Sequence, residues 1–195
     1  MTCSELKKLV ISDAYRYIGV NAFTWRGRVK LFFKCPGFNY VFKMRVTYFC
    51  SNSGIRKIFF PFAYIAYRKA MIKFGISIPY KTQIGYGFYI GHFGGITINS
   101  DTIIGNNVNI SQGVTIGQSG KDGEKACPVI KDRVYIAPKA TLVGNIVIED
   151  DAAIGANAFC NKNVPYSASV GGVPAKVISQ TGSKDYIHNI WDLEG

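Results

Sequence analysis

The chain has 195 residues, enough for one domain with an appendage, and its 48% hydrophobic and 18% charged residues are typical of a folded protein. Its net charge of +11 would suit nucleic acid, but residues 1–75 hold 14 Lys and Arg against only Glu5 and Asp13, while residues 76–195 are nearly neutral. The positive charge is therefore confined to residues 1–75 and does not extend over the whole chain. We expect no nucleic-acid partner.

The cysteines and histidines predict neither a disulfide framework nor a metal site. The five cysteines include no C-x-x-C pair, and the chain has two histidines, so we expect reduced thiols and no metal. No signal-peptide pattern is seen at the start of the chain. The longest apolar run, residues 58–67, is interrupted by Pro61 and is far shorter than the roughly 20 residues of a spanning helix. The prediction is a cytoplasmic protein.

Residues 1–75 predict a basic, aromatic and mostly helical cap. Ser12 and Asp13 would cap a helix over residues 13–20, and residues 55–74 read as a helix that ends at Gly75. The cap would cover the open end of a repeat array. Its Lys, Arg, Phe and Tyr suit a peripheral contact at the inner face of a membrane. They equally suit a cap whose aromatic rings are buried and whose charges are solvated, and both interpretations stay open.

Residues 76–178 carry an aliphatic or small residue at every sixth position. The series runs through Ile78, Ile84, Ile90 and Ile96, then Ile98, Ile104, Ile110 and Ile116, then Ile130, Ile136, Leu142, Ile148, Ile154 and Cys160. A period of six fits neither an amphipathic helix nor a lone strand. It predicts a mainly β fold, a parallel β-helix in which each hexad forms one side of a triangular coil and small residues occupy the corners.

The period is interrupted twice, and residues 179–195 follow it as a tail. The first interruption is read as two extra residues between Ile96 and Ile98, just after His92. At the second, 14 positions separate Ile116 from Ile130 where two hexads would need 12, and residues 118–127 are polar, Gly-rich and charged. Insertions in repeat arrays gather on one face, often the binding face. We therefore predict a projecting loop at 118–127.

A resemblance to a known family lies in four segments: GHFGGITIN (91–99), IGNNVNISQGVTIG (104–117), GKDGEKACPVI (120–130) and GGVPAKVI (171–178). They resemble the serine acetyltransferase family of hexapeptide acyltransferases, and more closely its short members from capsule, O-antigen and exopolysaccharide gene clusters. The resemblance covers roughly residues 75–178. It implies a left-handed β-helix, a homotrimer, acetyl-CoA as co-substrate and acetyl transfer to a hydroxyl group.

His92 is the candidate general base. An alcohol is a weak nucleophile at neutral pH and needs a base with a pKa near 7, which imidazole supplies. His92 is the one histidine of the repeat region, and its GHFGGI context matches the family. Asn109, Ser77 or a backbone carbonyl would orient the ring, and the sequence does not choose among them. His188, in the tail, is given no role.

The resemblance also implies a CoA site along the coils after the loop, between two subunits. Small residues let an extended ligand approach the backbone closely, and basic residues would meet its phosphates. The matching positions are Gly117, Ala137, Gly155 and Ala156, with Lys139 and Lys176 as the basic candidates.

Three departures from the family bear on the acceptor. The family has an Asp immediately before the catalytic His, another Asp early in the first coil, and a His just before the Pro that ends the loop. The corresponding residues here are Gly91, Ser77 and Cys127. Burying the ammonium and carboxylate of serine without charged partners is costly. We therefore expect a sugar hydroxyl of a bacterial surface polysaccharide or its precursor, bound by Asn109 and Ser111. The alternative is a serine O-acetyltransferase of cysteine biosynthesis, and a different class is a non-enzymatic scaffold, which His92 and the retained loop disfavour.

Overall fold

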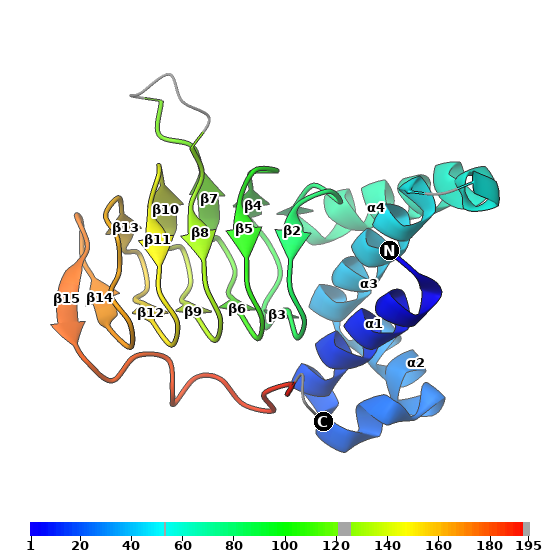
Figure 1. Ribbon diagram of the computed structural model, residues 1–195, viewed down its shortest axis with the longest axis horizontal. Coiled ribbons are helices and arrows are strands. Elements are labelled where there is room, and N and C mark those ends of the chain that lie inside the picture. Colours follow the sequence, from blue (N-terminus) through cyan, green and yellow to red (C-terminus); the bar gives the residue numbers. More distant parts are fainter. Residues whose placement is uncertain (53, 121–125, 193–195) are drawn as a thin grey trace.

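A helical cap closes one end of a triangular β-helix in the computed structural model, which describes residues 1–52, 54–120 and 126–192 (Figure 1). None of the helices in these ranges has the length and apolar content needed to cross a bilayer. The cap contains α1 (Cys3–Ile18), α2 (Trp25–Lys34), α3 (Pro36–Ser51) and α4 (Phe60–Phe74), with 3₁₀ turns at Gly19–Phe23 and Gly54–Phe59.

The helix predicted over residues 13–20 begins ten residues earlier than expected. A capping box starts α1, because Glu5 N donates to Thr2 Oγ1 (3.1 Å) and Thr2 N donates to Glu5 Oε2 (2.7 Å). Ser12 and Asp13 lie buried inside this helix and face the coils. The prediction for residues 55–74 is confirmed over α4, which ends at Gly75 with φ +61°; the residues before it form the second 3₁₀ turn.

The strands form three sheets, one on each side of the prism. The first sheet contains β1 (Ile76–Ser77), β4 (Ile96–Ile98), β7 (Thr115–Gly117), β10 (Thr141–Val143) and β13 (Phe159–Cys160). The second contains β2 (Gln83–Ile84), β5 (Ile103–Ile104), β8 (Val129–Ile130) and β11 (Val147–Ile148). The third contains β3 (Tyr89–Ile90), β6 (Asn109–Ile110), β9 (Tyr135–Ile136), β12 (Ala153–Ile154), β14 (Ser169–Gly171) and the antiparallel β15 (Lys176–Ser179).

The hexad isoleucines stack from coil to coil in the interior, as predicted. In the third sheet Ile90 pairs with Ile110, which pairs with Ile136, which pairs with Ile154, and all four are buried. Burial of each such side chain stabilises the fold by roughly 1.5–3 kcal/mol. One apolar core continues from these coils into Tyr40, Val41, Met44 and Tyr67 of the cap.

The register corrects both predicted interruptions. Ile90 pairs with Ile110 and Thr97 with Thr115, so the first two-residue insertion lies in the turn 91–95 that holds His92, and not between Ile96 and Ile98. At the second, Ile98 pairs with Ile116 and Ile104 with Ile130. Six positions in one coil thus match fourteen in the next, and the loop adds eight residues where the sequence suggested two. The chain leaves the coil after β7 (Figure 1), and residues 121–125 of the predicted loop lie outside the described residues.

The cap satisfies the backbone of the first coil, which would otherwise present an open strand edge. Tyr40 Oη donates to Ile78 O (2.8 Å) and accepts from Ile78 N (3.0 Å), and Tyr17 Oη does the same at Ile90 (2.9 and 3.0 Å). On the remaining side Arg45 donates to the carbonyls of Ile84 and Gly85 (2.7 and 2.6 Å). Each of the three sides therefore receives at least one cap side chain, and Tyr67 Oη adds a second donor to Ile78 O (2.7 Å).

The tail runs back along the third sheet to the cap (Figure 1). Tyr186 stacks on Tyr135 with ring centroids 4.3 Å apart, and Trp191 N donates to Asn107 Oδ1 (2.8 Å). At its far end Trp191 packs edge-on against Tyr15 of α1 at 5.6 Å. The tail therefore joins the last coil to the first helix.

Candidate functional site

The turn that holds His92 projects from the edge where the third sheet passes into the first. It lies between β3 and β4, and the imidazole is exposed. Glycines allow this path: Gly94 and Gly95 have φ values of +105° and +68°, and a Cβ on Gly91 would lie 3.1 Å from the Tyr89 ring. The two inserted residues thus carry His92 outward on a turn whose backbone path depends on Gly94 and Gly95.

No side chain of the described residues holds the His92 ring by a hydrogen bond. Ser77 lies half-buried on β1, paired with Thr97, and Asn109 is bonded elsewhere. The turn is anchored instead by Phe93, whose ring packs against Phe74 at the end of α4, 5.8 Å between centroids. The imidazole therefore remains open on both nitrogens to a substrate or to a neighbouring subunit.

The turns of successive coils stack beneath His92 to form one edge of the prism, which we call the His92 edge (residues 91–95, 111–113, 137–139 and 155–157). Backbone hydrogen bonds connect them: Gly113 N donates to Gly94 O (2.8 Å), Lys139 N to Gln112 O (2.9 Å) and Asn157 N to Pro138 O (3.0 Å). The edge brings together six of the residues that the sequence put forward: His92, Ser111, Ala137, Lys139, Gly155 and Ala156.

The His92 edge fits an extended ligand with amide groups, such as the pantetheine arm of CoA. Its turns carry small side chains, and a Cβ on Gly155 would lie 3.0 Å from Val170 O. The Oε1 atom of Gln112 is buried there without a hydrogen-bond partner, and a buried acceptor that lacks a partner favours a ligand donor. Gln112 was not among the residues predicted from the sequence. The Lys139 stem extends along the edge, because its Cγ would lie 2.9 Å from a Cβ on Gly113.

Two other candidates, Gly117 and Cys127, lie away from this edge within one chain. Gly117 is at the opposite end of β7, where the loop begins, and a Cβ there would meet nothing within 4 Å. Lys176 is exposed at the start of β15, where it pairs with Gly171 next to the Gly155 turn, so it lies at the last-coil end of the His92 edge. Cys127, at the end of the loop, is buried, and burial with the nearby Asp101 raises the pKa of its thiol. Cys127 therefore supplies no charge at neutral pH.

Asn109 is corrected from substrate ligand to structural residue. Its side chain is buried under the tail, where Oδ1 accepts from Arg16 Nη2 (2.7 Å) and Nδ2 donates to Tyr186 O (3.1 Å). Burial lowers the pKa of Arg16 to about 10, so the guanidinium stays charged at neutral pH and its bond to Asn109 is charge-assisted. Neither the tail nor α1 could be placed here from the repeat pattern.

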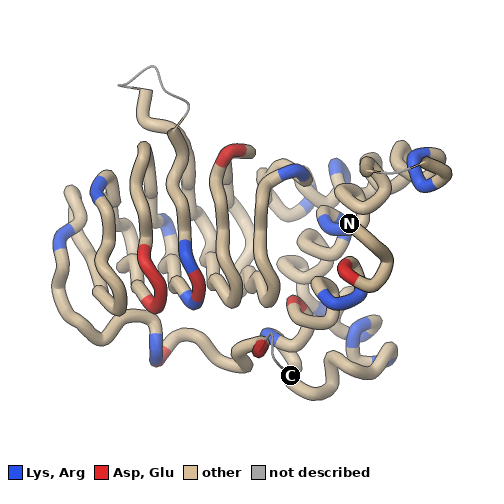
Figure 2. Tube along the Cα trace, in the orientation of Figure 1, with Lys and Arg blue, Asp and Glu red and all other residues tan. Residues whose placement is uncertain are grey.

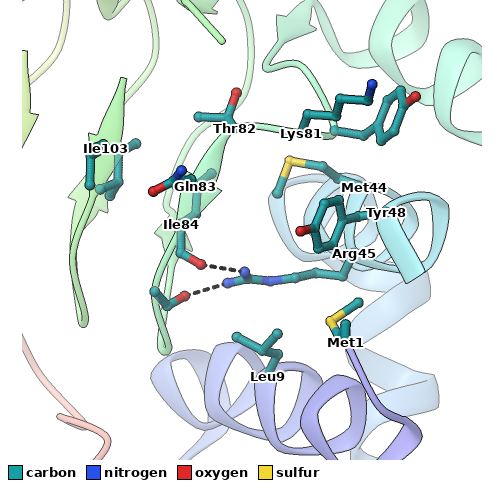
Figure 3. A pocket seen from close by; sticks show the side chains of 13 residues that line it. Met1, Leu9, Met44, Arg45, Tyr48, Lys81, Thr82, Gln83, Ile84 and Ile103 are labelled. Carbon is teal, nitrogen blue, oxygen red and sulfur yellow. Dashed lines mark hydrogen bonds between the residues drawn. The ribbon is translucent and has the colours of Figure 1, made fainter. Parts of the chain in front are cut away.

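A pocket of about 340 Å³ lies between the cap and β2 (Figure 3). Arg45 crosses it to the carbonyls of Ile84 and Gly85, and its guanidinium also pairs with Asp13 (3.0 and 3.1 Å). The charge of Arg45 is therefore already matched. We assign this pocket no ligand, and within the described ranges no group of three or more metal-ligating side chains is found.

Comparisons with known proteins agree on one family. No family model matches the chain. The serine acetyltransferase of Mycobacterium tuberculosis is 37% identical over 153 residues, which cover 78% of this chain and 65% of the relative. That of Haemophilus influenzae is 32% identical over 144 residues, 74% of this chain and 52% of the relative.

Solved structures give the same result. The serine acetyltransferase of Neisseria gonorrhoeae matches with a TM-score of 0.75 at 29% identity over 91% of this chain and 66% of that one. The soybean enzyme complexed with serine matches at 0.73 and 28% identity (90% and 70%), and the Brucella abortus enzyme complexed with coenzyme A at 0.72 and 26% (92% and 68%). The chain is related to the serine acetyltransferases.

This relationship confirms the left-handed β-helix and the acyltransferase resemblance expected from the hexads and motifs. The chain spans about half the length of the H. influenzae and Bacillus subtilis relatives, 52% and 51%. These relatives are all named as serine acetyltransferases. The comparisons therefore do not support the expected closer resemblance to enzymes of polysaccharide gene clusters.

Proposed function

We propose that the chain is an acetyl-CoA-dependent O-acetyltransferase in which His92 is the general base and the active unit is a homotrimer. The observation that carries this proposal is the exposed His92 on a turn lengthened by two residues, at the head of an edge of small side chains. The kinship with serine acetyltransferases supports acetyl-CoA as the donor.

His92 would move one proton through the reaction. As the acceptor oxygen attacks the thioester carbonyl carbon, the imidazole takes the hydroxyl proton, and backbone N–H groups stabilise the oxyanion that forms. The C–S bond then breaks, the acetyl group stays on the acceptor oxygen, and the imidazolium returns its proton to the CoA thiolate. No further oxidant, reductant or metal is needed for this balance.

Acetyl-CoA would lie along the His92 edge, with Gln112 Oε1 accepting from a pantetheine amide and Lys139 near a phosphate. Gly117 lies away from this edge, at the opposite end of β7, and a neighbouring subunit would supply it. Lys176 pairs with Gly171 at the last-coil end of the edge and would meet the ligand there. A prism with three equivalent sides assembles naturally around a threefold axis, which gives three sites shared between subunits.

Charge reversal at Lys139 tests this placement. We expect Lys139→Glu to raise the KM for acetyl-CoA by roughly five- to tenfold, the effect of one partly solvated charge contact, with kcat nearly unchanged. Lys131→Glu is the matched control, because Lys131 is also exposed but follows β8 on another edge. Equal rises in KM for both variants would mean that net charge, not the His92 edge, governs binding.

L-Serine is the first acceptor to test, since it is the acceptor in the names of the relatives. A sugar hydroxyl of a surface polysaccharide or its precursor is the second candidate, and a specific observation favours it. The three positions where the family carries ionisable acceptor-handling side chains are Gly91, Ser77 and Cys127 here, and none of them is charged.

A thiol-release assay with acetyl-CoA separates the two acceptors. Saturable turnover of L-serine without turnover of glycans would establish serine, whereas saturable turnover of capsule or O-antigen oligosaccharides alone would establish the sugar. Gly91→Asp sharpens the comparison, because it restores a carboxylate beside His92. We expect this variant to improve L-serine turnover relative to the glycans, and an unchanged ratio would show that position 91 does not select the acceptor.

A further inference from the structure

Helix α2 exposes an apolar stripe along its whole length. Trp25, Val29 and Phe33 follow one another at intervals of four residues, which places them on one face of the helix, and they are 65%, 46% and 79% exposed. A groove of about 360 Å³ continues this stripe toward Phe32, Phe38 and Phe42. Exposed apolar surface of this extent marks an interaction site.

The stripe points away from the protein's own core. The opposite face of α2 carries Leu31, which is 4% exposed and packs in the core of the cap, and Gly27, where a Cβ would collide with Asn21 O. The helix therefore packs against the rest of the cap through the face that carries Leu31 and Gly27. Trp25, Val29 and Phe33 are not among the buried residues of that core and keep much of their apolar surface exposed.

Basic side chains flank the stripe without any acidic neighbour in the sequence. Arg26, Lys30 and Lys34 are exposed and recur at the same interval of four, directly beside the apolar residues. The chain has no Asp or Glu between Asp13 and Asp101. Figure 2 shows the Lys and Arg positions spread over the cap. A second copy of α2 would bring further positive charge against this face, which disfavours self-association there.

We propose that α2 docks the protein on a lipid bilayer that contains anionic headgroups. The helix would lie in the plane of the interface, with Trp25, Val29 and Phe33 among the acyl-chain boundary and the flanking Arg and Lys on lipid phosphates. Tryptophan favours this depth, since its ring is apolar and its N–H is polar. The proposal does not depend on which acceptor the enzyme uses.

Vesicle flotation with the full chain tests this docking. Vesicles of phosphatidylglycerol and phosphatidylcholine are compared with phosphatidylcholine alone, at low and high salt. We expect binding to the anionic vesicles only, weakened by salt. Trp25→Ser/Phe33→Ser and Lys30→Gln/Lys34→Gln should each lower the bound fraction at least tenfold. The control Tyr166→Ser/Lys162→Gln changes exposed residues of the last coils, away from the cap, and should bind like the wild type.

Two readouts exclude other occupants of the stripe. Trp25 fluorescence should shift to the blue on anionic vesicles, and Trp25→Phe should still float but lose the shift. Equal flotation of wild type and both α2 variants would overturn the proposal. So would a fall in oligomer mass by light scattering, without lipid, in Trp25→Ser/Phe33→Ser, because another protein copy would then cover the stripe. Thermal unfolding of each variant at the wild-type temperature verifies that the fold is kept.

Discussion

Replacing His92 by alanine is expected to lower kcat for acetyl transfer by roughly 10²- to 10⁴-fold, the usual contribution of a positioned acid–base group. The reason is that an unassisted hydroxyl attacks a thioester slowly at neutral pH. The turn should keep its shape, because it is fixed by Gly94, Gly95 and the contact of Phe93 with Phe74. The KM for acetyl-CoA should change little, since the remaining turns of the edge are intact.

His188→Ala is the matched control for this experiment. His188 is also an exposed histidine, and only its backbone carbonyl is used, as the acceptor for Arg16 Nε (3.0 Å). This variant should turn over like the wild type. If His92→Ala kept near-wild-type kcat in the thiol-release assay, His92 would be removed from the mechanism.

Replacing Asp13 by alanine is expected to lower the free energy of unfolding by about 3–5 kcal/mol, the cost of leaving a buried charge without its partner. Asp13 is buried in α1, and both its oxygens accept from Arg45 while Oδ1 also accepts from Phe88 N (2.8 Å). Burial raises the pKa of this carboxyl and Arg45 opposes that rise. Urea unfolding of the two proteins measures the loss.

Two further variants make this prediction specific. Asp13→Ala/Arg45→Met removes both charges and should recover part of the lost stability, because no unpaired guanidinium remains buried. Arg133→Ala breaks the half-exposed pair with Asp151 (2.6 Å) and should cost no more than about 1 kcal/mol. An Asp13→Ala variant as stable as Arg133→Ala would mean that the Asp13–Arg45 pair does not hold the cap to the coils.

The repeat predicted the β-helix because each hexad acts locally: an inward isoleucine and a small corner residue define one side of a coil without reference to distant sequence. The same reasoning misplaced the first insertion. Ile96 has the six-residue spacing of the earlier hexads. In the structure, however, Ile98 and not Ile96 pairs with Ile116 of the next coil, and the two extra residues lie in the turn around His92. Spacing alone gives the number of inserted residues only to within whole hexads, since the second insertion has eight residues and not two. It also does not say on which side of an isoleucine the extra residues fall.

The candidate site was predictable where it depends on the repeat and hidden where it depends on the cap and tail. Ser111, Ala137 and Gly155 share an edge because equivalent turns of a coil must stack. The contacts of Asn109 with Arg16 and Tyr186 join residues 93 and 77 positions apart, and nothing in the local sequence announces them. Residues whose partners come from non-repetitive segments need the three-dimensional structure.

The returning tail changes how such an array should melt. Stacked coils contact only their neighbours, so an open solenoid frays from whichever end is weakest. Here Trp191 lies against Tyr15 and Phe23, while Ser183 N, further back along the tail, bonds to Asp151 O (2.8 Å). The last coil cannot peel away without pulling on the first helix. Because the tail connects the two ends of the array, we expect both ends to unfold together in one cooperative transition.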